Sequence, residues 1–95
     1  VYKRQSYRYD TAREQELVQF TEQQLVPAFR RMPGFRRYTG AHDRDAGHGV
    51  SITEWDDLPH AQGLREALCA TLLQGIADVG AQLDAPQFFE VVAQS

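Results

Sequence analysis

The sequence contains few of the features that characterise disulfide-bonded, membrane-spanning or nucleic-acid-binding proteins. It contains one cysteine, Cys69, so no internal disulfide can form, and this is typical of a reducing compartment. No apolar run approaches the roughly 20 residues that a membrane-spanning helix needs. The formal net charge is −3, whereas a nucleic-acid surface needs a concentrated basic stripe. We therefore expect a cytoplasmic protein that binds neither nucleic acid nor a membrane.

Signals for cofactors are also missing. The sequence has no glycine-rich phosphate loop, and its histidines do not have the spacing of a structural zinc site. His42 and His48 flank a polar connection, Asp43–Gly49, whose aspartates could suggest a metal, but a polar hairpin tip explains the two histidines better. We expect no metal and no cofactor.

The composition is that of an ordinary globular domain. The 95 residues are 42% hydrophobic and 24% charged, which fits a single domain with a modest core. We expect one domain over residues 1–95. Val1–Gln5 (VYKRQ) is interpreted as a candidate non-native leader, because the chain lacks an initiator methionine.

Hydrophobic periodicity predicts a β-α-β-β-α-β order. Thr11 and Glu14 have the spacing of a capping box, and Pro27 should distort the first helix near Gln23–Val26. A break is expected near Gly63. The simplest closure is an α+β, ferredoxin-like fold, with a four-stranded antiparallel sheet and both helices on one face. The expected elements are strand Gln5–Tyr9, helix Thr11–Met32, strands Phe35–His42 and Val50–Trp55, helix His60–Leu83 and strand Gln87–Gln94.

The two faces of the sheet should differ. Side chains alternate along a strand, so Val50 and Ile52 point one way and Ser51, Thr53 and Trp55 the other. Tyr7 and Tyr9 share a face, and the last strand has large apolar groups on both sides. Two helices cover only one face, which predicts an open aromatic face. We expect a second copy to cover it in a homodimer.

Several short motifs resemble the dimeric α/β-barrel superfamily, and within it the antibiotic biosynthesis monooxygenase (ABM)-like domains. They are Val26–Phe29 (VPAF), Met32–Phe35 (MPGF) with Tyr38, Ser51–Asp57 (SITEWDD) and His60-Ala61. The resemblance implies a homodimer with a largely apolar pocket in each subunit. Members include cofactor-independent oxygenases of phenols and anthrones, haem-degrading oxygenases, quinol oxygenases and polyketide cyclases. The expected second helix has no histidine beyond His60, which argues against the haem-degrading branch.

The resemblance and the strand pattern together nominate site residues. Trp55 is a candidate pocket wall for an aromatic substrate, or else a core or interface tryptophan. His60 is a candidate proton acceptor, or else a surface histidine near a helix start. Tyr38, Ser51, Thr53 and Tyr7 are candidate substrate contacts, with core packing as the default for strand aromatics. Cys69 is interpreted as a buried small hydrophobe.

Two functions follow as hypotheses. The first is a cofactor-independent monooxygenase acting on a small aromatic, anthrone or quinol. The second is a non-catalytic dimeric module that binds a small apolar ligand or stabilises a partner. An enclosed cavity that holds Trp55 together with a titratable group favours the first hypothesis, and a cavity packed shut by Phe88 or Phe89 favours the second.

Overall fold

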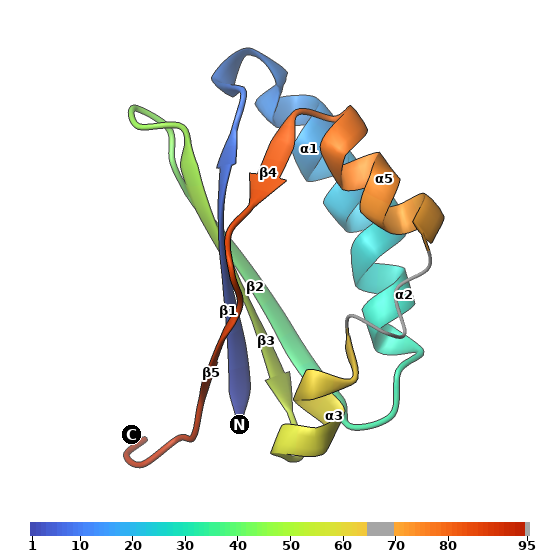
Figure 1. Cartoon of the computed structure of the whole chain (residues 1–95), viewed down its shortest axis with the longest axis vertical. Helices are drawn as coiled ribbons and strands as arrows, with labels where there is room; N and C mark the ends of the chain where they lie inside the picture. Colours follow the sequence, from blue (N-terminus) through green and yellow to red (C-terminus); the bar gives the residue numbers. More distant parts are fainter. Residues whose placement is uncertain (65–69, 95) are drawn as a thin grey trace.

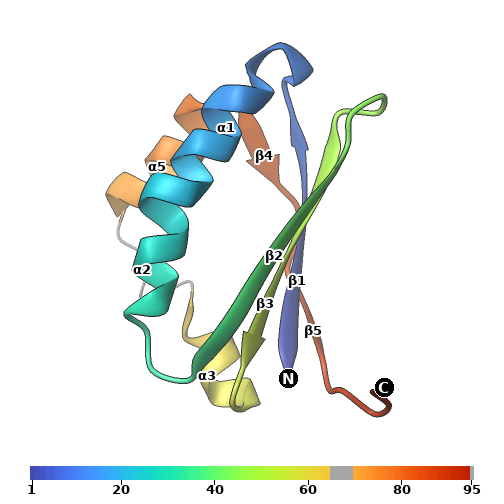
Figure 2. The ribbon, with the colours of Figure 1, turned by 180° about the vertical axis from the view of Figure 1, so that it is seen from behind.

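The chain folds as one sheet with its long helices on one side, in a computed structural model that describes residues 1–64 and 70–94 (Figure 1). The long helices of the described residues lie on the same side of the sheet in the reverse view as well (Figure 2). The elements are β1 (Tyr2–Tyr9), η1 (Thr11–Arg13), α1 (Glu14–Phe20), η2 (Thr21–Leu25), α2 (Val26–Arg30), β2 (Phe35–Asp43), β3 (His48–Trp55), α3 (Leu58–Gln62), α5 (Ala70–Asp78), β4 (Ala81–Leu83) and β5 (Gln87–Phe89).

The sheet is antiparallel throughout its described pairings, with the order β2-β3-β1-β4 and with β5 also paired to β1. β4 pairs with the end of β1 at Tyr7–Tyr9, and β5 pairs with its start at Tyr2–Arg4. The two short strands therefore occupy the fourth position of the sheet one after the other. The ferredoxin-like α+β fold that the sequence predicts is confirmed.

The boundaries near the C-terminus differ from the prediction. The second helix was expected to reach Leu83, but α5 ends at Asp78 and residues 81–83 form β4. Gly80 explains the early end, because its φ of +90° is a left-handed conformation that terminates helices and favours glycine. The last strand was expected over Gln87–Gln94, but β5 ends at Phe89.

The start of the first strand was also placed too late. Tyr2, Lys3 and Arg4 belong to β1, where they pair with β3 on one side and with β5 on the other. A strand with neighbours on both sides has its backbone groups satisfied, so it extends beyond the alternation seen at Gln5–Tyr9.

The first helical region contains the distortion that Pro27 predicts. Thr21–Leu25 is a π-helical turn, closed by the Val26 N–H donating to the Thr21 carbonyl. Proline has no N–H and its ring collides with the preceding turn, so a widened turn just before it avoids the collision. The predicted capping box is wrong, because Asp10 caps this region by accepting from the Ala12 N–H at 3.0 Å. Glu14 is thereby free for other partners.

The second helical region starts at a clear cap. The Asp57 side chain accepts from the His60 N–H, and Pro59 occupies the first turn, where its missing N–H costs nothing. α3 then ends with Gly63 as its C-cap, so the predicted break is confirmed. The expected burial of Cys69 lies outside the described residues.

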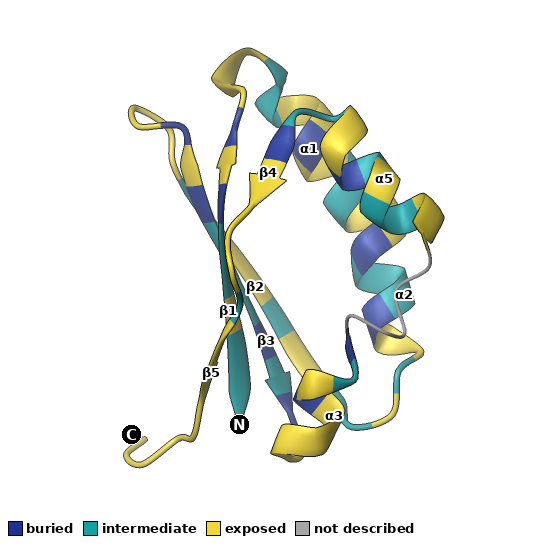
Figure 3. Cartoon of the chain, viewed as in Figure 1, coloured by how far each residue is buried: buried dark blue, intermediate teal, exposed yellow. Residues whose placement is uncertain are grey.

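The aromatic face of the sheet lies beneath the helices, not open as predicted. Tyr7, Tyr9 and Trp55 are buried and belong to one core cluster with side chains of the helices (Figure 3). The expectation failed because burying large aromatic rings removes more apolar surface from water than burying Val50 and Ile52 does. The helices therefore cover the aromatic side.

The outer face of the sheet is the side that carries Val50 and Ile52, and both are half-buried. Their strand partners Ser6, Arg4 and Thr39 share this face, so it mixes aliphatic and polar groups. Tyr2 and Phe89 stack at its edge with ring centroids 5.3 Å apart. Within the described residues, no helix is long and apolar enough to cross a bilayer.

Candidate functional site

A small cavity of about 70 Å³ lies between the sheet and the helices. Its walls are mainly apolar, with Leu17, Leu25 and Phe29 contributed by the first helical region. The four residues that the sequence nominates as substrate contacts, Tyr7, Tyr38, Ser51 and Thr53, also lie on its wall. Their role in binding stays a prediction, but the strand alternation brings all four to one place.

A wider groove of about 830 Å³ adjoins this cavity and shares Tyr7, Thr21 and Tyr38 with it. Val18 and Val26 add apolar surface along its length. The remaining wall is largely polar and charged, formed by Glu22, Gly40, Ala41, His42, Asp43, Arg44 and Asp45. A ligand that is apolar at one end and polar at the other matches this division, since small-molecule sites pair apolar walls with a few placed polar groups.

Tyr7 reaches from β1 across β3 to His42 on β2. Its hydroxyl lies 2.7 Å from His42 Nε2. The strand between them carries Gly49, which pairs with both residues in the sheet. A Cβ at Gly49 would lie 2.3 Å from the Tyr7 ring, so only glycine leaves the path open.

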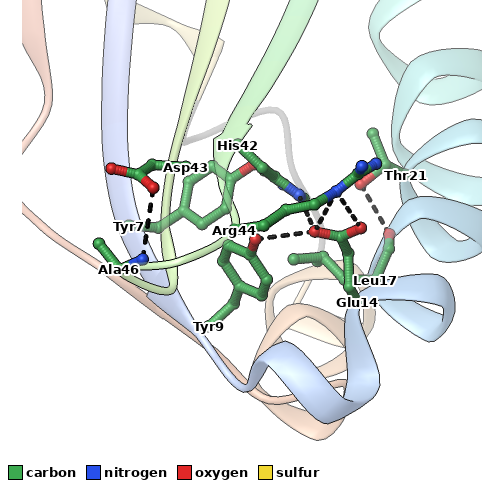
Figure 4. Close-up of polar contacts among 9 residues, drawn as sticks. All are labelled: Tyr7, Tyr9, Glu14, Leu17, Thr21, His42, Asp43, Arg44 and Ala46. Carbon is green, nitrogen blue, oxygen red and sulfur yellow. Dashed lines mark hydrogen bonds and ion pairs between the residues drawn. The ribbon is translucent and has the colours of Figure 1, made fainter.

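Glu14 anchors the other side of His42 (Figure 4). Its Oε2 lies 3.2 Å from His42 Nδ1 and accepts from the Tyr9 hydroxyl at 2.8 Å. Arg44 Nε donates to Glu14 Oε1 at 2.9 Å. The hydrogen bond from Tyr9, followed by those from His42 and Arg44, lowers the pKa of Glu14 below its ordinary value. Glu14 is therefore a carboxylate with three donors around it.

When His42 is neutral, this network decides which of its two ring nitrogens carries the hydrogen. An ionised carboxylate only accepts hydrogen bonds, so Nδ1 of His42 carries the hydrogen that points to Glu14. Nε2 is then the lone-pair nitrogen and accepts from the Tyr7 hydroxyl. Burial raises the pKa of Tyr7 well above its usual range, so its phenol keeps its proton.

Trp55 is not among the residues that line the cavity, although it contacts one of them. It is 2% exposed, its ring packs edge-on to Phe35 at 5.4 Å, and its Nε1 donates to Thr53 Oγ1 at 2.8 Å. Phe35 in turn packs on Phe29, which does line the cavity. Trp55 therefore supports the cavity wall from behind.

His60 is also outside the cavity and groove. Its Nδ1 lies 2.6 Å from Asp57 Oδ1, at an exposed position on the first turn of α3. Its ring lies against Gly34, where an added Cβ would come within 2.6 Å of it. The structure thus does not bring His60 together with Tyr38, Ser51, Thr53 and Tyr7.

Sequence reasoning missed His42 and Glu14. His42 was interpreted as part of a polar hairpin tip, but its side chain is only 14% exposed and faces the site. His48, across the same hairpin, is exposed as expected. Alternation from Tyr38 through Gly40 would have placed His42 on the cavity side, and this was the available signal. Glu14 had been assigned to the capping box that the structure lacks.

Comparisons with known proteins place the fold but not the activity. No family model and no curated sequence matches the chain. The monooxygenase of gene ActVA-Orf6 of Streptomyces coelicolor, solved with nanaomycin D, superposes with a TM-score of 0.68 at 14% identity, covering 99% of this chain and 90% of its own. A variant of SnoaB, a cofactor-independent oxygenase from Streptomyces nogalater, gives 0.67 at 20% identity, covering 98% and 93%.

A third similar structure is a dimeric ferredoxin-like protein from an uncultured marine organism. It has a TM-score of 0.59 at 9% identity, with coverage of 99% of this chain and 92% of that one. The chain therefore has the same ferredoxin-like fold as these two monooxygenases and this dimeric protein. A fold at these identities supports many activities, so function has to come from the site.

Proposed function

We propose that the chain is a cofactor-independent monooxygenase whose substrate is a small aromatic, anthrone or quinol. The observation that carries the proposal is the apolar cavity that opens into a groove beside two tyrosine hydroxyls, those of Tyr7 and Tyr38. Burial raises the pKa of Tyr38 as well, so both phenols keep their protons at neutral pH. Tyr38 can donate to a substrate oxygen, and Tyr7, whose hydrogen goes to His42 Nε2, can accept from a substrate hydroxyl. Both contacts suit an electron-rich ring that carries oxygen substituents.

The volumes of the cavity and the groove support an arrangement in which the substrate occupies both of them. A cavity of about 70 Å³ is smaller than the cavity of roughly 150 Å³ that encloses a benzene ring in another protein, so a bound ring would fill it and reach into the groove. A larger fused-ring substrate would extend into the groove past Tyr7, Thr21 and Tyr38. The reacting ring then lies among the hydroxyls, with the rest of the molecule towards Glu22 and Arg44.

The reaction needs no external reductant. When one ring methylene of an anthrone becomes a carbonyl, the substrate loses four electrons and two hydrogens. Dioxygen takes these four electrons, and one of its oxygen atoms enters the product while the other leaves as water. The protein has to bind the ring, exclude bulk water and stabilise the oxyanion that makes the ring reactive towards dioxygen.

The proposal is tested by dioxygen uptake. Purified protein treated with a chelator should consume dioxygen when given an anthrone or a hydroquinone, above the rate without protein. Ser51→Phe fills the cavity and should lower the rate by about tenfold or more. Gln19→Phe adds the same ring on the exposed side of α1 and serves as the control. Tight binding without uptake across the panel would instead support a non-catalytic ligand-binding module.

We further propose a homodimer formed through the outer face of the sheet. Val50 and Ile52 lie there with no described helix over them, and the stacked pair Tyr2 and Phe89 extends the apolar area. A chain of 95 residues has a modest core and gains buried area by pairing. The dimeric ferredoxin-like protein supports this assembly by its fold.

A further inference from the structure

We propose that Tyr7, His42 and Glu14 form a proton relay that removes the hydroxyl proton of the substrate through the phenol of Tyr7. Geometry carries the inference. The Tyr7 hydroxyl is 2.7 Å from His42 Nε2, and His42 Nδ1 is 3.2 Å from Glu14 Oε2, so the three groups lie in one hydrogen-bonded line. The relay deepens the proposed function and rests on it.

The relay has one end at the proposed binding site. Tyr7 lines both the cavity and the groove, and His42 lines the groove. The other end, Glu14, is held by Tyr9 and Arg44, so it does not swing away when His42 changes its charge. A positioned carboxylate behind a histidine orients the ring and stabilises the imidazolium that forms.

The step balances without another reactant. The substrate O–H bond breaks and its proton goes to the Tyr7 oxygen, while the Tyr7 O–H bond breaks and its proton goes to His42 Nε2. The electron pair stays on the substrate oxygen, and the positive charge on His42 faces the negative charge on Glu14. Tyr7 is neutral before and after the step, which agrees with the direction in which burial shifts its pKa. In this scheme Tyr7 is the catalytic residue, His42 accepts the proton through it, and Glu14 is a positioning residue.

Other titratable groups lie near the relay and contribute to its electrostatic environment. From β1, the end of β2, the turn after it, and the first helical region these are Tyr9, Asp43, Arg44, Asp45 and Glu22. Behind the sheet, Arg4, His48 and Asp84 line a second recess together with Tyr7 and His42. A change in pH acts on all of them, so the test compares matched variants and does not rest on a single profile.

The first experiment measures ionisation in a bound phenol without dioxygen. 4-Nitrophenol is the probe, because its anion absorbs visible light and its neutral form does not. Under anaerobic conditions, wild-type protein should raise the ratio of ionised to neutral bound probe at a given pH by about tenfold over the ratio in solution. Tyr7→Phe and His42→Gln should abolish this increase. The control is His60→Gln, the exposed histidine outside the cavity and the groove, which should behave as wild type.

Two results would overturn the relay. One is an unchanged ionised fraction in His42→Gln protein whose circular dichroism and thermal unfolding match wild type. The other is loss of ionisation in His60→Ala but not in His42→Gln, which would make His60 the proton acceptor. If His42→Gln fails to fold, Tyr7→Phe keeps the test decisive, because it removes only the hydroxyl.

The second experiment separates the relay from the oxygenase proposal. With an anthrone as substrate, kcat of His42→Gln should fall by about a hundredfold while KM changes little, and the loss of activity at acid pH that the relay predicts for wild type should disappear. Glu14→Gln should shift this acid loss, because it removes the charge that stabilises the imidazolium. Ionisation of nitrophenol without dioxygen uptake would support the relay and reject the oxygenase. Dioxygen uptake with the same pH profile in His42→Gln would reject the relay and leave the oxygenase standing.

Discussion

Tyr7 and Gly49 lie opposite each other on neighbouring strands, and the missing side chain of Gly49 is what lets the Tyr7 ring cross β3. A Cβ on Gly49 would approach the ring to 2.3 Å, closer than any real contact. Because Gly49 has no side chain, the Tyr7 side chain of β1 can lie over β3 and contact a side chain of β2. His42 on the far side of this gap completes the contact.

Gly49→Ala should displace the Tyr7 ring and break its hydrogen bond to His42. Overpacking of this kind costs about 1–3 kcal/mol, and urea unfolding measures it. Gly63→Ala is the matched control, because its Cβ would meet the Pro59 and His60 carbonyls at 3.4 and 3.6 Å, which are ordinary contacts, and its φ is helical. We expect the control to change the free energy of unfolding by no more than about 0.5 kcal/mol. Equal stability of the two variants would contradict the crossing of Tyr7 over β3.

Thr53→Val should destabilise the protein through Trp55. The buried Trp55 Nε1–H donates to Thr53 Oγ1, and valine removes the acceptor without changing the shape of the side chain much. An unpaired buried donor costs about 1–3 kcal/mol. In a Trp55→Phe background, where no indole N–H remains, the same substitution should cost less. A double-mutant cycle by urea unfolding checks this, and additive effects of the two substitutions would refute the coupling.

Stability should fall at acid pH partly through Glu14. Its pKa is lowered in the folded state, first by the Tyr9 hydrogen bond, so the unfolded chain binds the proton more readily. The stabilisation is therefore complete above the ordinary glutamate value and is lost as the pH falls through the lowered one. Glu14→Gln should flatten this part of the profile of unfolding free energy against pH. An equally steep acid loss in Glu14→Gln would assign the effect to other carboxylates.

Tyr9 should contribute the opposite trend at alkaline pH. Burial, together with the bond to Glu14, raises the pKa of Tyr9 from 10.0 to about 12. The unfolded chain then loses the proton before the folded one does, so the stabilisation is present below pH 10 and is lost as the pH rises towards 12. Tyr9→Phe should reduce this loss, as measured by urea unfolding at a series of alkaline pH values. A loss that is the same in Tyr9→Phe and wild type would show that Tyr9 titrates normally.

Ile52→Arg should convert the proposed dimer into a monomer. The substitution places a charge at the centre of the outer face, between Arg4 and Thr39, where a second copy would bury it unpaired. Sedimentation at micromolar concentration should give about twice the chain mass for wild type and the chain mass for the variant. Ser51→Arg is no control because it enters the cavity, but Gln19→Arg on the exposed side of α1 is suitable. A wild-type chain that sediments alone would reject the dimer.

Particular residues show which parts of the fold could be predicted from the sequence. Alternation along Val50–Trp55 correctly separated Ile52 from Ser51 and Thr53, because a strand has a fixed two-residue period. Alternation alone could not say which of the two faces the helices would cover, so the aromatic face was placed on the wrong side. Pro27 and Gly63 marked the helix distortions correctly because their effects are local.

The site was harder to predict because it depends on distant pairings. Tyr7 and His42 are 35 residues apart, and their contact follows from β3 lying between β1 and β2 with Gly49 in register. Glu14 fitted a local capping pattern, and only the position of Asp10 as the actual cap frees it for His42. Tertiary contacts of this kind override local signals, and a single sequence does not carry them.

The most direct test of the account is the fate of labelled dioxygen. Purified, chelator-treated protein is given an anthrone under ¹⁸O₂, and the product is examined by mass spectrometry. A monooxygenase places one labelled atom in the new carbonyl and the other in water, and the Tyr7→Phe variant should form far less of this product. A product whose new oxygen comes from water, or no product beyond the protein-free rate, would contradict the assignment.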